Sequence, residues 1–164
     1  MVASPSSNAL LESNLGDAPD NWHVPCSTRT PEEWGFEVAK TVLIVEDEKL
    51  LAKTLSTALK EAGYQAVVTH SAEQAEKRLL GGDHFDLVIL DNRLPQVSGL
   101  EFLKTARERG VDSKVILMTA FDSREVKAKA KKLDVDEYVR KPFDLDGMIG
   151  KVSDLIGDPG NGRR

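Results

Sequence analysis

The chain alternates between short continuous apolar runs and longer stretches in which apolar residues recur every three or four positions. A continuous run is typical of a strand buried on both faces, whereas the wider spacing is typical of a helix with one buried face. From residue 41 onward the two patterns alternate regularly. The predicted strands cover residues 41–45, 66–68, 87–90, 115–118 and 138–139, and the predicted helices follow them at 51–62, 72–79, 100–106, 126–133 and 145–156.

Local signals agree with these helix ends. Ser71 with Gln74, and Ser98 with Glu101, have the spacing of a capping box, in which a hydroxyl and an acid or amide bond each other's backbone at a helix start. Glycine commonly follows the last turn of a helix. The glycines placed to end the first three helices are Gly63, Gly81 with Gly82, and Gly110.

Strict alternation of strand and helix predicts an α/β fold with a parallel sheet covered by helices on both faces. For five strands we expect a doubly wound, flavodoxin-like sheet of order 2-1-3-4-5. Strands one and three are then neighbours, and the chain reverses direction between them. Ligands of such sheets bind at the carboxyl ends of the strands beside this point.

Polar residues follow four of the five predicted strands at this edge. Glu46 and Asp47 follow the first strand, Asp91 the third, Thr119 the fourth and Lys141 lies just after the fifth. Each has an ordinary explanation by itself: acids stabilise the start of a following helix, and lysines and threonines are common at turns. Their joint occurrence at the ends of four strands favours one common functional site over four unrelated explanations.

The residue types at this site suggest its chemistry. Three carboxylates in one place repel one another unless a cation compensates their charge. Oxygen ligands alone select Mg²⁺, Mn²⁺ or Ca²⁺, and a small number of protein ligands leaves room for water and a phosphoryl oxygen, as Mg²⁺ prefers. We therefore expect Mg²⁺, with Mn²⁺ as a substitute, and a carboxylate that can act as a nucleophile.

Composition narrows the remaining possibilities. The chain has 164 residues and a formal net charge of −5, which argues against non-specific binding to nucleic acid or anionic membranes. Cys26 is the single cysteine, so no internal disulfide forms and a cytoplasmic location is expected. No apolar run approaches the ~20 residues of a membrane-spanning helix, and the N-terminus lacks the pattern of a secretory signal.

Residues 1–39 differ from the rest of the chain. They are rich in Ser, Pro, Asn and Asp without a sustained apolar period, so we predict a mostly disordered extension. Trp22, Trp34 and Phe36 leave a second possibility open, because large aromatic residues are depleted in disordered segments and could dock on a surface. The folded domain is expected at 40–156, followed by a flexible tail at 157–164.

Four short motifs, in this order and spacing, carry a resemblance to a known family. They are Glu46-Asp47, Asp91 with Leu94-Pro95 and Ser98-Gly99, Met118-Thr119-Ala120, and Lys141-Pro142-Phe143. From about residue 40 to 156 the chain resembles the receiver domain of two-component response regulators, of the stand-alone type. The resemblance also places Asp134 where this family usually has glycine, and Gly147 and Gly150 are each expected to weaken the last helix by about 1 kcal/mol.

The resemblance implies a set of site residues. Asp91 would accept a phosphoryl group from a sensor histidine kinase or phosphotransfer protein. Glu46, Asp47, Asp91 and the backbone carbonyl of Arg93 would hold Mg²⁺. Lys141 would bind the phosphoryl group, and its peptide bond to Pro142 would be cis, which is found at only ~5–6% of such bonds.

The resemblance also implies a switch. Thr119 and Tyr138 would move on phosphorylation, while Arg93, Phe121 and Ala120 would modulate the lifetime of the acyl phosphate. The domain would lose its phosphoryl group slowly and would not turn over external substrates.

The residues themselves indicate the output face: the fourth helix has only Val126, Ala130 and Leu133 as apolar anchors and is otherwise rich in lysine, so we expect it to shift easily. A downstream protein would bind the face formed by the fourth helix, fifth strand and fifth helix.

Two alternatives belong to other functional classes. The first is a degenerate receiver that acts as a phosphorylation-independent interaction module, although such a module would usually lack the acidic pair, Asp91 or Lys141. The second is another enzyme on the same fold. An aspartyl-phosphate phosphatase would want an acid at the position of Arg93, and a flavin protein would want a phosphate-binding loop where Glu46 and Asp47 stand.

Only a short segment follows Ile156, and we expect no DNA-binding output domain in it. The chain would thus be a stand-alone receiver or a receiver excised from a longer protein. Its N-terminal extension and Met1 favour the former.

Overall fold

The computed structural model describes residues 39–121 and 123–159. Within them, strands and helices alternate as the apolar pattern predicts. The strands are β1 (Thr41–Val45), β2 (Gln65–Thr69), β3 (Leu87–Asp91), β4 (Lys114–Thr119) and β5 (Glu137–Arg140). The helices are α1 (Lys49–Glu61), α2 (Ala72–Leu80), α3 (Gly99–Glu108), α4 (Arg124–Lys132) and α5 (Leu145–Ile156).

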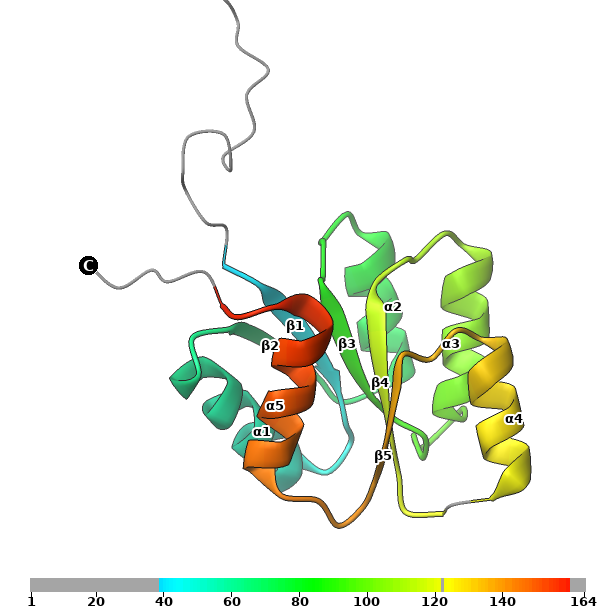
Figure 1. Cartoon of the computed structure of the whole chain (residues 1–164). Helices are drawn as coiled ribbons and strands as arrows, with labels where there is room; N and C mark the ends of the chain where they lie inside the picture. Colours follow the sequence, from blue (N-terminus) through cyan, green and yellow to red (C-terminus); the bar gives the residue numbers. More distant parts are fainter. Residues whose placement is uncertain (1–38, 122, 160–164) are drawn as a thin grey trace, which may run out of the picture.

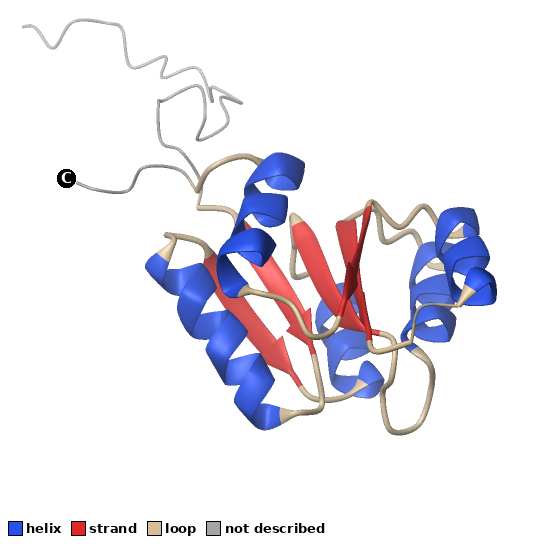
Figure 2. Ribbon diagram, turned by 60° about the horizontal axis from the view of Figure 1, so that its bottom comes forward, coloured by secondary structure: helices blue, strands red, loops and turns tan. Residues whose placement is uncertain are grey.

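The five strands form one parallel sheet of order β2-β1-β3-β4-β5, which confirms the predicted topology. Figure 1 shows α1 and α5 on one face of the sheet and α2, α3 and α4 on the other. The turned view in Figure 2 shows the same sandwich of helix, sheet and helix. All strands point the same way, so their carboxyl ends meet at one edge.

Each face of the sheet has its own core. Val42, Ile44 and Ile89 point towards α1 and α5, where they pack with Leu55 and Met148. The intervening residues of the same strands point the other way and pack with α2, α3 and α4. Alternate side chains of a strand face opposite sides, so a sheet that is covered twice needs continuous apolar runs.

One of the two predicted capping boxes is complete. At α3, the backbone N–H of Glu101 donates to Ser98 Oγ, and Glu101 accepts from the Ser98 backbone. At α2, Gln74 N–H donates to Ser71 Oγ at 3.3 Å, but Gln74 Oε1 accepts from the backbone of His70 instead. The prediction for the second box is therefore wrong in its returning bond, which comes from the backbone N–H of His70 and not from that of Ser71.

The structure also refines the predictions about turns and glycines. Asp134 has a φ of 50°, the left-handed geometry expected where the family has glycine. A methyl group on Gly150 would meet nothing within 4 Å, as expected for a weakening glycine in α5. A methyl group on Gly147 would instead lie 2.9 Å from Asp144 Oδ2, and Asp144 caps α5 by accepting from Gly147 N–H. Gly147 therefore makes room for the cap.

The predictions for the N-terminal segment, with Trp22, Trp34, Phe36 and Cys26, lie outside the described residues, as do those for 160–164. Among the residues that the structure describes, no helix is long and apolar enough to cross a membrane.

Candidate functional site

The carboxyl ends of β1 and β3 bring three acids together. Glu46 and Asp47 follow β1, Asp91 ends β3, and their carboxylate oxygens lie within 4.8 Å of one another. Glu46 and Asp91 are buried, whereas Asp47 is exposed. The acids therefore form a site with a buried floor and one side open to solvent.

Lys141 supplies the positive charge of this site. It follows β5, and its backbone N–H donates to the carbonyl of Thr119 at the end of β4. Its Nζ lies 2.7 Å from Glu46 Oε2 and 3.2 Å from Asp91 Oδ2. The Lys141–Pro142 peptide bond is cis, as predicted.

The charges of the site do not balance within the protein. Burial raises the pKa of Glu46; the hydrogen bond from Lys141 lowers it in part, the charge of Asp91 raises it again, and the net shift is upward. Burial alone would lower the pKa of Lys141, but its bond to Glu46 and the charge of Asp91 outweigh burial and raise it. Glu46 thus holds a proton more tightly chiefly because it is buried, with the charge of Asp91 adding to this effect, and Lys141 does so because two acids lie beside it.

This excess of negative charge is the feature of the site that a bound cation would offset. The donors are carboxylates, which are hard oxygen ligands, and one side of the cluster is open. Lys141 alone does not offset the repulsion between the three acids, and a small divalent cation would offset the remainder. The residues present therefore fit Mg²⁺.

The hydroxyl of Thr119 is held by the loop that follows β4. Its Oγ1 accepts from Phe121 N–H at 3.1 Å and donates to the Phe121 carbonyl at 3.0 Å. The same carbonyl accepts from Tyr138 Oη at 3.3 Å. Thr119 and Tyr138, predicted as a pair, are therefore joined through one backbone group of Phe121.

The mouth of the site is covered in part by a cation–π contact. The guanidinium of Arg93, two positions after Asp91, lies 4.1 Å from the ring centroid of Phe121. Both residues are exposed, and Phe121 is one of the few large apolar side chains that are exposed among the described residues. Ala120 is exposed between Thr119 and Phe121 and offers no bulk of its own.

Two contributors to the site were missed in the sequence. His70 follows β2, and its Nδ1 lies 2.9 Å from the backbone carbonyl of Glu46. Gly99 begins α3, and a methyl group there would lie 2.3 Å from the carbonyl oxygen of Asp91. The place of His70 directly after the second strand, at the same edge of the sheet, is the sequence signal for it. Gly99 carries no chemistry, so its role depends on tertiary structure.

The comparison with protein families identifies a family for most of the described chain. The model of the "Response regulator receiver domain" family matches residues 42–153. Among curated proteins, the chain is 34% identical over 111 residues to "Transcriptional regulatory protein DltR" of Streptococcus agalactiae, which covers 68% of this chain and 49% of that protein. The chain thus spans about half the length of the curated relatives it matches.

Solved structures give the same result. The response regulator protein TrrA of Thermotoga maritima, in complex with Mg(2+)-BeF, superposes with a TM-score of 0.63 at 36% identity, over 71% of this chain and 98% of that one. A CheY-like receiver domain protein of Methanospirillum hungatei superposes with a TM-score of 0.69 over 73% and 94% of the two chains; at 24% identity it supports the fold alone. By its fold, its acidic cluster and its match to the family model over 42–153, the chain belongs to the response regulator receiver domain family.

Proposed function

We propose that this domain is a phosphorylation switch in which Asp91 accepts a phosphoryl group from the phosphohistidine of a sensor histidine kinase or a phosphotransfer protein. The observation that supports it most is the cluster of Glu46, Asp47 and Asp91 with Lys141 bound to two of the three acids. The proposed place of action is the cytoplasm.

In the reaction, a carboxylate oxygen of Asp91 attacks the phosphorus atom of phosphohistidine. The nitrogen–phosphorus bond breaks, the imidazole leaves with the electron pair, and an acyl phosphate forms on Asp91. Water later cleaves the acyl phosphate, which restores the carboxylate and releases inorganic phosphate. The protein returns to its starting state slowly, so it acts as a switch and not as a turnover enzyme on external substrates.

The neighbours of Asp91 position the transferred group. Glu46, Asp47, Asp91 and the backbone carbonyl of Arg93 would hold Mg²⁺, which when bound neutralises charge on the phosphoryl oxygens. TrrA, the relative solved with Mg(2+)-BeF, is consistent with this assignment. Lys141 Nζ, now 3.2 Å from Asp91, would move onto a phosphoryl oxygen and leave Glu46 to the metal.

The signal would leave the site through Thr119. To donate to a phosphoryl oxygen, its hydroxyl must give up the bond that it donates to the Phe121 carbonyl. The Phe121 carbonyl also holds Tyr138 Oη, so the release of Thr119 changes the environment of Tyr138 as well. Arg93, Phe121 and Ala120 would set how readily water reaches the acyl phosphate.

The face formed by α4, β5 and α5 is the proposed output surface. In α4 only Ala130 is buried, while Lys129, Lys131 and Lys132 occupy its last turn. A helix held by little apolar contact is easily repositioned. A downstream protein that binds this face would therefore sense the state of Asp91.

The alternative of a phosphorylation-independent interaction module finds no support. Its expected sign is the loss of a site residue, yet the acids and Lys141 are all present and assembled. Nothing in the described residues favours a second function.

The proposal is tested by incubation with acetyl phosphate, with and without Mg²⁺, followed by intact-mass measurement. The wild-type protein should gain the mass of one phosphoryl group only with Mg²⁺, and Asp91→Asn should gain none. Asp112→Asn is the matched control, because Asp112 is an exposed aspartate of the loop before β4, at the opposite edge of the sheet. Equal labelling of Asp91→Asn and Asp112→Asn would contradict the proposal.

A further inference from the structure

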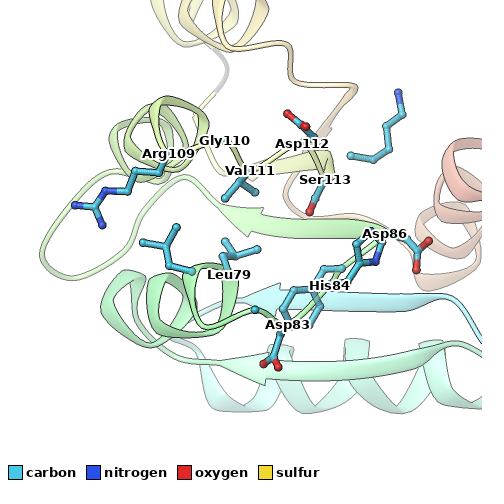
Figure 3. A pocket seen from close by; sticks show the side chains of 13 residues that line it. Leu79, Asp83, His84, Asp86, Arg109, Gly110, Val111, Asp112 and Ser113 are labelled. Carbon is cyan, nitrogen blue, oxygen red and sulfur yellow. The ribbon is translucent and has the colours of Figure 1, made fainter.

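A cavity of about 590 Å³ lies at the edge of the sheet opposite to Asp91. It lies between the loop that leads from α2 into β3 and the loop that leads from α3 into β4 (Figure 3). Leu79, Leu80 and Val111 give it an apolar side, and His84 and Asp112 are among its polar residues. Leu80 is 43% exposed, so an apolar side chain of this wall faces solvent.

The apolar wall continues beyond this cavity. A second hollow of about 140 Å³, between α2 and α3, shares Leu79, Leu80, Arg109 and Val111 with the first. It also reaches Phe102 of α3. The two hollows share these lining residues and together form one surface, here called the floor groove, with room for more than one side chain.

The chain enters the folded domain beside the floor groove. Lys40 Nζ lies 3.2 Å from Asp86 Oδ1, and Thr41 N–H donates to Asp86 Oδ2 at 2.8 Å. Asp86 lines the cavity, and its carbonyl accepts from Lys114 N–H on the far side. The segment that precedes Lys40 is therefore tethered at the rim of the groove.

The sequence just before this tether contains large aromatic residues. Trp34 precedes Lys40 by about six residues, so an extended chain lets it reach about 20 Å from that point. Phe36 is closer still. A tethered segment binds at a high effective concentration, so even weak contacts with the groove would be populated.

We propose that the segment around Trp34 and Phe36 docks in the floor groove of its own domain, with Trp34 in the cavity. An indole has a large apolar body and a single N–H that seeks an acceptor when buried. The cavity offers both requirements, with Leu79, Leu80 and Val111 for the ring, and Asp83, Asp112 and Ser113 as acceptors at its polar side. The docked segment lies away from Asp91 and leaves the phosphorylation site open.

The test uses the full chain with Trp22→Phe, so that Trp34 is its only tryptophan. The fluorescence of Trp34 should be blue-shifted compared with the same protein in denaturant, and acrylamide should quench it less. In this background, Leu80→Glu should shift the emission to the red and raise the quenching. Leu50→Glu is the matched control, because Leu50 is 72% exposed on α1, away from the groove, and it should change neither quantity.

The proposal is overturned if Trp34 is as accessible to acrylamide as free tryptophan, or if Leu50→Glu acts as strongly as Leu80→Glu. A second measurement leaves the groove intact, in case Leu80→Glu fails to fold. Amide NMR shifts of the wild type and of Trp34→Ser should differ at Leu79, Leu80, His84 and Val111; unchanged shifts there overturn docking. The differences should also persist on roughly tenfold dilution, since loss on dilution would indicate docking between two copies and contradict the proposal.

Discussion

At the scale of single residues, the repulsion between the acids of the site lowers the stability of the metal-free protein. Glu46, Asp47 and Asp91 lie within 4.8 Å of one another, and only Lys141 compensates two of them. The raised pKa of Glu46 reflects both its burial and this crowding. Lys141 pairs with Glu46 and Asp91, and within the described part of the chain Asp47 forms no ion pair, so its charge adds repulsion.

We therefore expect Asp47→Asn to stabilise the metal-free protein. Removal of one exposed charge should add about 1 kcal/mol to the free energy of unfolding, the Coulomb energy of two unit charges about 4 Å apart in water, or roughly 4 °C in Tm. Addition of Mg²⁺ should raise the Tm of the wild type and leave Asp47→Asn nearly unchanged, because the variant binds the ion poorly. Thermal melts with and without EDTA measure both effects, and a variant that melts lower than the wild type in EDTA would contradict this account.

A second prediction at this scale concerns Gly99. A methyl group there would press on the backbone of Asp91 and Asn92, at 2.3 Å and 3.0 Å, and neither can move freely. Gly99→Ala should cost roughly 1–3 kcal/mol and slow phosphorylation of Asp91, since β3 and α3 must separate. Gly150→Ala is the matched control: it meets no neighbour and should stabilise α5 by about 1 kcal/mol. Urea unfolding of both variants checks the opposite signs, and equal signs would refute the argument.

The residues that sequence reasoning identified are those whose chemistry is unusual at a strand end. Glu46, Asp47, Asp91, Thr119 and Lys141 were visible because polar groups end otherwise apolar runs. The pairing of Lys141 with Glu46 and the pairing of Arg93 with Phe121 were not visible, because they depend on side-chain directions across the edge of the sheet.

At the scale of elements, the helices differ in how firmly they are held. Helix α3 buries Leu100, Phe102, Leu103 and Ala106 along one side, whereas α4 buries only Ala130. Apolar spacing predicted both helices, and the small number of apolar residues in α4 predicted that this helix buries little, in agreement with the structure. The lower anchorage of α4 suits an element that responds to Asp91.

Hydrogen exchange measures this difference directly. Amides of α4 should exchange faster than those of α3 in the unphosphorylated protein, because fewer buried contacts resist local opening. On phosphorylation the rates in α4 should change while those in α3 stay close to their starting values. Equal protection of the two helices, or a response confined to α3, would argue against α4 as the moving element.

Helix ends show where local patterns are insufficient. The box at Ser98 and Glu101 formed as predicted, but Gln74 bonds the backbone of His70 instead of closing the box at Ser71. Both patterns look alike in sequence, because the spacing of the two residues does not show which backbone N–H lies within reach of the side chain at the third helical position.

At the scale of the whole molecule, one topological fact creates the site. Alternating strands and helices with right-handed crossovers place β1 between β2 and β3, so residues 45 positions apart along the chain become neighbours at the sheet edge. The alternation could be predicted because each continuous apolar run is buried on both faces. The excess of negative charge at this edge could also be predicted from the three acids, but the burial of Glu46 and Asp91 and the distances between the acids could not.

The most direct test of the central claim is the position of the phosphoryl group. An acyl phosphate on aspartate is reduced by borohydride to homoserine, which tandem mass spectrometry locates in the sequence. After reaction with acetyl phosphate and Mg²⁺, we predict homoserine at position 91 and at no other aspartate. Homoserine at another position, or its absence from a protein that binds Mg²⁺ and is fully folded, would contradict the account.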